Sequence, residues 1–92
     1  HIALFGLGDQ IGYPEWFQDA LGYLWHRVVR LGASSRGEWP NIGYDFIQSK
    51  ALNEEKNFFV GLALDAENQF DIVDDQICQW SSQVVKEFGL WP

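Results

Sequence analysis

The residues with the clearest capacity for chemistry lie in one glycine-rich stretch near the start of the chain. Gly6, Gly8 and Gly12 follow four apolar residues, Ile2–Phe5, and Tyr13 closes the stretch. Glycine lets backbone N–H groups come close to a planar or anionic ligand, and a tyrosine ring offers a flat face for stacking. The stretch therefore predicts a ligand-binding loop.

No other set of side chains has the types and spacing of a catalytic or metal centre. The two histidines, His1 and His26, have no cysteine or carboxylate at ligand spacing. Asp74 and Asp75 suit helix capping, and the sequence has no nucleophile elbow and no Walker loop. We predict no enzyme activity and no bound metal.

The loop is predicted to sit between a strand and a helix. Ile2–Phe5 is too short for a helix and suits a strand buried on both faces. The helix is predicted over Pro14–Leu31, because proline is tolerated in a first turn and Gly32 is a good C-terminal cap. Its buried face follows helical spacing at Phe17, Leu21, Leu24 and Val28.

A second strand and helix are predicted at the other end of the chain. Phe58–Leu64 has the aromatic, valine and leucine content of a strand, and Asp65–Gln69 is the loop at its carboxyl end. The last helix is expected to begin at Asp71 or Asp74, both good N-caps, and to end at Gly89. Its expected core stripe comprises Val73, Ile77, Trp80, Val84 and Phe88.

The middle of the chain, from Ala33 to Asn57, is mixed and rich in turn-forming residues. Ser34–Arg36 would make a poor buried strand, because a buried Arg36 needs a partner for its charge. This strand is therefore expected to be absent, frayed or turned into an edge. Trp39–Tyr44 reads as a turn-rich loop, and Ser49–Lys56 as a short helical turn.

Several blocks of the sequence, in order, resemble the long-chain flavodoxin family. They are Phe5–Glu15, Phe17, Asp19–Gly22, Trp39, Gly43–Phe46, Phe59–Asp65, Asn68–Gln69 and Glu87–Leu90. The resemblance covers the carboxyl-terminal half of a flavodoxin; the family's phosphate-binding loop and first flavin-contacting loop have no counterpart. It implies a truncated three-layer α/β fold, β-α-loop-β-α, with residues 1–92 as one half domain.

The resemblance also implies an FMN site and a role in electron transfer. Backbone groups would hold the edge of the flavin ring at Gly8, Asp9, Gln10 and Gly12. Tyr13 would stack on one face of the ring, and Asp65 would lie close to it, whereas Trp16 stands where the family commonly has a polar residue. Without the phosphate loop, several charge-assisted hydrogen bonds of roughly 1.5–3 kcal/mol each are missing, so FMN binding is expected to be weak or lost.

A two-stranded parallel sheet is not stable alone, since parallel sheets are normally larger and covered on both faces. We therefore expect a homodimer, formed edge to edge or by exchange of an element. Trp16, Tyr23 and Trp25 on the first helix would be interface residues. The alternative to a flavin module is an engineered or selected folding fragment that forms a stable homo-oligomer without a ligand.

Composition narrows the possible partners. The formal net charge of −7 argues against nucleic acid and anionic membranes, and no apolar run approaches the ~18 residues of a membrane span. The negative charge has two equally good explanations. It would attract a basic redox partner if flavin is bound, or it would simply keep the protein in solution. Cys78, the single cysteine, is expected to be buried and inert, and the family resemblance makes the cytoplasm the expected location.

Overall fold

The first strand of the chain lies at the centre of the molecule. A computed structural model describes residues 1–90 and splits this strand into β1 (Ile2–Ala3) and β2 (Phe5–Leu7), with Leu4 between them. β1 pairs in parallel with β3 (Ser35–Arg36), and β2 pairs in parallel with β6 (Leu62–Leu64). The register places Gly6 opposite Ala63.

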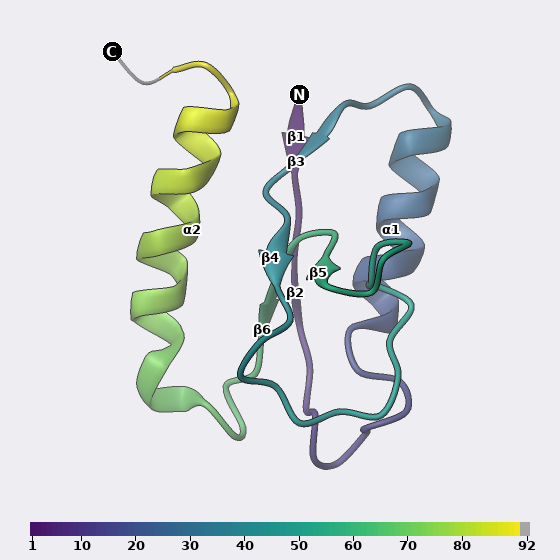
Figure 1. Cartoon of the computed structure of the whole chain (residues 1–92), viewed down its shortest axis with the longest axis vertical. Coiled ribbons are helices and arrows are strands. Elements are labelled where there is room, and N and C mark those ends of the chain that lie inside the picture. Colours follow the sequence, from purple (N-terminus) through teal and green to yellow (C-terminus); the bar gives the residue numbers. More distant parts are fainter. Residues whose placement is uncertain (91–92) are drawn as a thin grey trace.

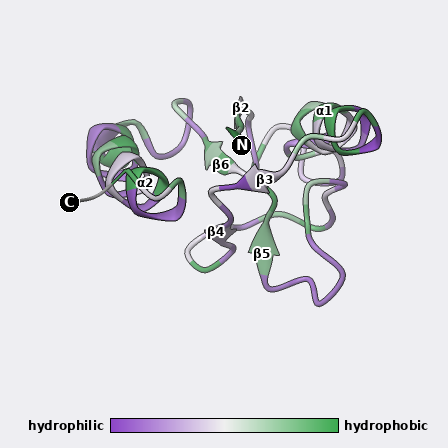
Figure 2. Cartoon of the chain, turned by 90° about the horizontal axis from the view of Figure 1, so that it is seen from above, coloured by the Kyte–Doolittle hydropathy of each residue, from purple (hydrophilic) through white to green (hydrophobic). Residues whose placement is uncertain are grey.

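Two helices cover the two faces of these strands, as Figures 1 and 2 show. α1 (Asp19–Arg30) lies on one side and α2 (Val73–Glu87) on the other. Side chains alternate between the faces of a strand, so Gly6 lies under α1, where Leu21 is its neighbour. Phe5 points to the α2 side, where it lines a cavity with Trp80. This arrangement confirms the predicted α/β fold with three layers.

The core lies between α1 and the strands and is rich in aromatic rings. Its buried members are Phe17, Leu21, Ala51, Phe59, Val60 and Ala63. Phe59 is in edge contact with both Phe17 and Tyr44, at ring-centroid distances of 5.8 and 5.2 Å. Burying one such ring stabilises the fold by roughly 1.5–3 kcal/mol, so this cluster fixes α1 against the sheet.

The first helix begins at Asp19, so the predicted start at Pro14 is wrong. Gln18 has a left-handed backbone, with φ of 62°, which interrupts a helix. The carbonyl of Pro14, which a longer helix would use internally, instead accepts hydrogen bonds from the N–H groups of Ile47 and Gln48, at 2.7 and 3.1 Å. The middle segment of the chain therefore supplies the hydrogen-bond donors that a first helical turn would have supplied to Pro14.

The second predicted strand, Phe58–Leu64, is two short strands. β5 (Phe58–Phe59) pairs antiparallel with β4 (Trp39–Pro40), whereas β6 pairs with β2. Between them Gly61 passes close to the first strand, where an added Cβ would lie 2.3 Å from the carbonyl oxygen of Leu4. Only glycine permits this approach, which lets the chain change partners within a few residues.

The middle segment corrects two further expectations and settles a third. Of the three possibilities for Ser34–Arg36, the structure shows a short edge strand, in which the Arg36 guanidinium donates to Ser34 Oγ and the Ser35 carbonyl. Trp39–Pro40, predicted as a loop, is strand β4. Ser49–Lys56 forms turns and one bridge to Phe59 rather than a helical turn.

The last helix starts without either predicted aspartate cap. A 3₁₀ turn at Phe70–Ile72 leads into α2, and Ile72 occupies the N-cap position with no side-chain hydrogen bond. Asp74 still lies in the first turn, where its charge favours the helix dipole. Cys78 is exposed, so the prediction of a buried thiol is wrong. Only one side of α2 packs against the rest of the protein, and Cys78 is not on that side.

Three hydrogen bonds hold α2 beside the edge of the sheet. Trp80 Nε1 donates to the Gly37 carbonyl at 2.8 Å, and Gln83 Nε2 donates to the Glu38 carbonyl at 2.7 Å. The Gly37 N–H donates to Glu87 Oε1 at 2.7 Å. These bonds fix the carboxyl-terminal half of the helix, although little of its surface is buried.

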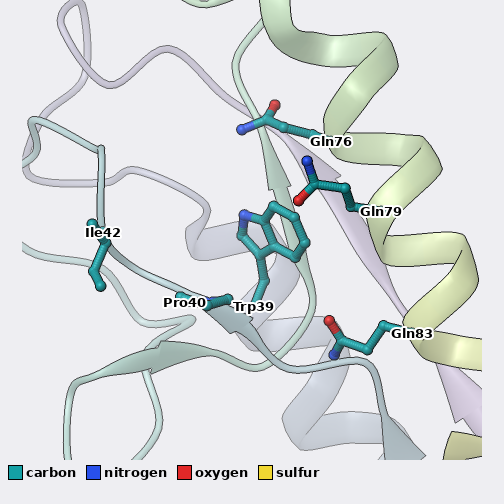
Figure 3. A pocket seen from close by; sticks show the side chains of 6 residues that line it. All are labelled: Trp39, Pro40, Ile42, Gln76, Gln79 and Gln83. Carbon is teal, nitrogen blue, oxygen red and sulfur yellow. The ribbon is translucent and has the colours of Figure 1, made fainter.

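A cavity of about 390 Å³ separates α2 from β4, and Figure 3 shows three glutamines of α2 facing it across from Trp39. The side chains around it are Trp39, Pro40, Ile42, Gln76, Gln79 and Gln83. Trp39 Nε1 and Gln76 Nε2 both donate to the hydroxyl of Tyr44, which donates to the Ala63 carbonyl at 2.6 Å.

No helix within residues 1–90 is long and apolar enough to cross a membrane.

Candidate functional site

The glycine-rich loop, residues 8–13, leaves the carboxyl end of β2. The N–H of Gly8 donates to the carbonyl of Leu64 at 2.9 Å, so the loop starts where β6 ends. Because β2 and β6 are parallel, Asp65 comes out at the same edge of the sheet. Ligands commonly bind at this edge in α/β proteins.

The buried side chain of Asp65 anchors the loop through hydrogen bonds. Its side chain is fully buried, at 0% exposure. Oδ2 accepts two hydrogen bonds from Gln10, one from the backbone N–H and one from the side-chain amide, both at 2.9 Å. Oδ1 accepts from the backbone N–H groups of Glu67 and Asn68, at 3.1 and 3.0 Å. The carboxylate thus joins both loops at this edge of the sheet.

Asn68 connects the two acidic residues of the site. Its side-chain amide donates at 2.8 Å to Asp9 Oδ1 and at 2.8 Å to Asp65 Oδ2. Asp9 Oδ1 also accepts from the N–H groups of Ile11 and Gly12, at 3.2 and 2.8 Å. The Asp9 side chain therefore shapes its own turn while Asn68 ties that turn to Asp65.

Hydrogen bonds keep both carboxyl groups ionised. Burial alone would raise the pKa of Asp65, but the N–H of Gln10 and the amide and N–H of Asn68 more than offset it, and the pKa lies below its ordinary value. The pKa of Asp9 is also lowered, first by the Gly12 N–H and then by the Asn68 amide. The site carries two negative charges near neutral pH.

Gln10 links the loop to the middle segment of the chain. Its side chain is buried, and its Oε1 accepts a hydrogen bond from the N–H of Asp45. A second link lies nearby, where Gln69 Nε2 donates to the Gly43 carbonyl at 2.8 Å. Three segments distant in the sequence thus meet around the loop.

Most N–H groups of the loop are already used within the protein. Those of Gly8, Gln10 and Gly12 donate to Leu64, Asp65 and Asp9, and that of Tyr13 donates to the Asp9 carbonyl at 2.9 Å. Within residues 8–13, only the N–H of Asp9 has no acceptor among the residues that the structure describes. A ligand edge at this loop would find one free N–H donor, at Asp9.

Tyr13 and Trp16 form an exposed aromatic pair beside the loop. Tyr13 is 59% and Trp16 63% exposed, and their ring centroids lie 6.4 Å apart at an interplanar angle of 43°. A flat ring between two parallel aromatic rings needs a separation of about 7 Å, twice the usual contact distance. The pair therefore offers one continuous aromatic surface rather than a slot.

The structure brings the residues predicted for the site to one edge of the sheet. Those six residues are Gly8, Asp9, Gln10, Gly12, Tyr13 and Asp65. Asp65 lies beneath the loop and supports it through Gln10. Sequence reasoning missed the bridging role of Asn68; its place three residues after an aspartate, typical of an Asx-type turn, was the available signal. Within residues 1–90, no three His, Cys, Asp or Glu side chains are placed to hold a metal ion.

The sequence is similar to flavodoxins from several bacteria. No protein-family model matches the sequence. A flavodoxin of Nostoc sp. (strain PCC 7120) is 52% identical over 89 residues, which is 97% of this chain and 51% of the relative. The chain corresponds to the carboxyl-terminal half of a flavodoxin. The same extent is matched by flavodoxin 2 of Escherichia coli K12, which is 46% identical over 96% of this chain and 51% of its own length.

Solved structures agree with the sequence comparison. Fusobacterium nucleatum flavodoxin bound to flavin mononucleotide superposes with a TM-score of 0.86 at 33% identity. The superposition covers 92% of this chain and 50% of the solved one. The predicted resemblance to half of a flavodoxin is thus confirmed in sequence and in fold, and the chain spans about half the length of the relatives it matches.

Proposed function

We propose that this chain is a flavodoxin-derived module for electron transfer, not an enzyme, in which the loop of residues 8–13 binds the ring of FMN. The observation that carries the proposal is the exposed Tyr13 ring on a loop held by the buried Asp65. A loop held in this way loses little freedom when a ligand binds, which favours affinity. That a 33% identical flavodoxin is bound to flavin mononucleotide supports the choice of ligand.

The residues of the loop fit a flat heteroaromatic ring. The face of Tyr13 would stack on it, which contributes about 0.5–1.5 kcal/mol beyond area burial. The free N–H of Asp9 would donate to a polar atom at the ring edge, and backbone carbonyls at Gly8, Gln10 and Gly12 are the other candidate contacts. When bound, FMN would supply reversible one- and two-electron chemistry.

The charge of the site would act on that chemistry. The carboxylates of Asp9 and Asp65 place two negative charges near the proposed ring position. Negative charge disfavours a ring that gains further negative charge on reduction. The protein would therefore bind oxidised FMN in preference to an anionic reduced form. A basic redox partner is proposed only for the flavin-bound protein, and a cytoplasmic location rests on the family resemblance alone.

A fluorescence titration with FMN, and with riboflavin as the ligand that lacks phosphate, tests the proposal. Stacking on Tyr13 should quench the flavin, and weak binding predicts a Kd in the micromolar range or above, about −8 kcal/mol or less favourable. Equal affinity for the two ligands would indicate binding through the ring alone. No quenching of either ligand at millimolar protein would contradict the proposal and leave the alternative, a folding fragment without a ligand.

A further inference from the structure

The cavity between α2 and β4 has an aromatic wall and a wall of amides. Gln76, Gln79 and Gln83 line it at helical spacing, so they share one face of α2. Trp39 lies across from them. Figure 3 shows its indole ring largely face-on, with the three carboxamides along one side of the ring and Ile42 on the other side. The cavity therefore offers a flat apolar surface bordered by hydrogen-bonding groups.

Hydrogen bonds within the protein hold both walls in place. Trp39 Nε1 donates to the hydroxyl of Tyr44 at 2.9 Å. From the helix, Gln76 Nε2 donates to the same hydroxyl at 3.2 Å, and Gln83 Nε2 donates to the Glu38 carbonyl at 2.7 Å. The two walls are thus bridged at both ends of the glutamine row, and a preformed site of this kind loses little freedom when a ligand binds.

Hydrogen-bonding capacity is left over between these two bridges. The side chain of Gln79 is exposed and makes no hydrogen bond within residues 1–90. Gln76 is 8% exposed, and its Oε1 has no donor among the residues that the structure describes. Buried side-chain amides normally have partners for their polar atoms. The glutamine row can therefore still donate to a ligand and accept from it.

The charge of the surroundings favours a neutral ligand. None of the six side chains that line the cavity is ionisable, although the chain carries a net charge of −7. An anion would be repelled by the whole protein and would find no cation in the cavity, and a cation would find no carboxylate there. The volume of about 390 Å³ lies within the range of small-molecule sites, about 300–1,000 Å³.

We infer that this cavity binds a neutral planar heterocycle whose edge carries a hydrogen-bond donor next to an acceptor, as the edge of adenine does. Its ring would stack on the indole of Trp39, since a tryptophan face is a general platform for bases. Gln79 lies beside the rim of that indole, and a glutamine carboxamide pairs with the adenine edge through two hydrogen bonds. The cavity shares no residue with the loop of residues 8–13, so the inference does not depend on the proposed function.

An NMR titration of the full chain with adenosine, which is uncharged at pH 7, tests the inference. We expect saturable shifts of the Trp39 indole N–H signal and of the Gln79 side-chain amide signals, with a Kd of about 0.1–1 mM for a ligand of this size. Purine riboside has the same ring without the exocyclic amine and should bind at least tenfold more weakly. Equal affinity for the two ligands, or shifts confined to other parts of the chain, would overturn the inference.

A matched pair of glutamine substitutions locates the contact. Gln79→Leu keeps the size of the side chain and removes its hydrogen bonds, and leucine suits an exposed helical position. It should weaken adenosine binding at least tenfold. Gln48 is also exposed but lies outside the cavity, so Gln48→Leu should leave the Kd unchanged. Equal effects of the two substitutions would overturn the assignment to Gln79.

Two further comparisons keep this site apart from other ligands and from the flavin loop. Methyl glucoside and a proline-rich peptide can also pack on a tryptophan, and either one binding at Trp39 as tightly as adenosine would overturn the choice of a planar heterocycle. Tyr13→Ala should leave adenosine binding unchanged, and Gln79→Leu should leave FMN binding unchanged. Loss of FMN binding with intact adenosine binding contradicts only the proposed function, and the reverse result contradicts only this inference.

Discussion

Gln10 donates two hydrogen bonds to a single oxygen of Asp65, which lies 55 positions further along the chain. Both bonds are 2.9 Å long, and the carboxylate that accepts them is fully buried. The pair connects the loop after β2 with the loop after β6. The shape of the candidate site therefore depends on one carboxylate that a ligand would not touch.

Asp65→Asn should lower the free energy of unfolding by about 2–3 kcal/mol. The amide keeps the size of the side chain but turns one acceptor into a donor, which then faces the N–H groups of Gln10 or Asn68, and an unsatisfied buried polar group costs about 1–3 kcal/mol. Urea unfolding measures the change. Glu54→Gln, at an exposed position, removes the same charge and should change stability by less than about 0.5 kcal/mol; similar losses in both variants would contradict the role of Asp65.

Acid should destabilise the protein partly through the same residue. The pKa of Asp65 is lower in the folded state than its ordinary value, which is about 3.9 for an unfolded chain. Its contribution is therefore complete above that unfolded pKa and is lost as the pH falls toward the folded pKa. Unfolding free energies measured from pH 7 to pH 3 should fall less steeply for Asp65→Asn than for the unchanged protein. Parallel curves would refute the assignment.

Tyr13→Ala should weaken flavin binding two- to tenfold, the loss expected for one aromatic stacking contact of about 0.5–1.5 kcal/mol. Tyr23 supplies the control, since it is exposed to the same extent, 59%, but lies on α1 away from the loop. Tyr23→Ala should leave the Kd for FMN unchanged in the fluorescence titration. If both variants bind FMN as the unchanged protein does, Tyr13 is not the stacking ring.

Gly61→Ala should destabilise the protein by about 2 kcal/mol or more. The new methyl group would lie 2.3 Å from the Leu4 carbonyl oxygen, and neither backbone can move without breaking the β2–β6 pairing, so the core would be strained as by overpacking. Thermal unfolding measures the effect. Ala66→Ser, in the exposed loop after β6, should be nearly neutral, and a neutral Gly61→Ala would mean that the two strands are not held this closely.

Tyr44→Phe should cost about 1–3 kcal/mol, because the hydroxyl accepts from Trp39 and Gln76 and donates to Ala63. Burial raises the pKa of this hydroxyl. Without it, the Nε2 of Gln76 would lose its acceptor. The Oε1 of Gln76 already has no donor among the described residues. Urea unfolding, with the exposed Tyr23→Phe as comparison, checks the value. Equal stability of the two variants would show that the network is dispensable.

The sequence by itself determined the order of the two main strand regions and the two helices, and the position of the candidate loop. Strand patterns are short and local, so Ile2–Phe5 and the run before Asp65 could be recognised from residue type alone. The glycines and Tyr13 marked the loop, and the ordered blocks marked the family. Helix ends were less certain: the pattern at Pro14 was compatible with a helix, and only the bonds from Ile47 and Gln48 to its carbonyl show why the helix starts later.

The tertiary structure alone decided how the site is held together. Hydrogen bonds across 55 or more positions, such as those of Gln10 and Asn68, depend on which strand ends meet, and local sequence does not encode that distance. The same holds for the change of partner at Gly61 and for the exposure of Cys78. Each follows from which surfaces come into contact, and contact is a property of the packed chain rather than of any one segment.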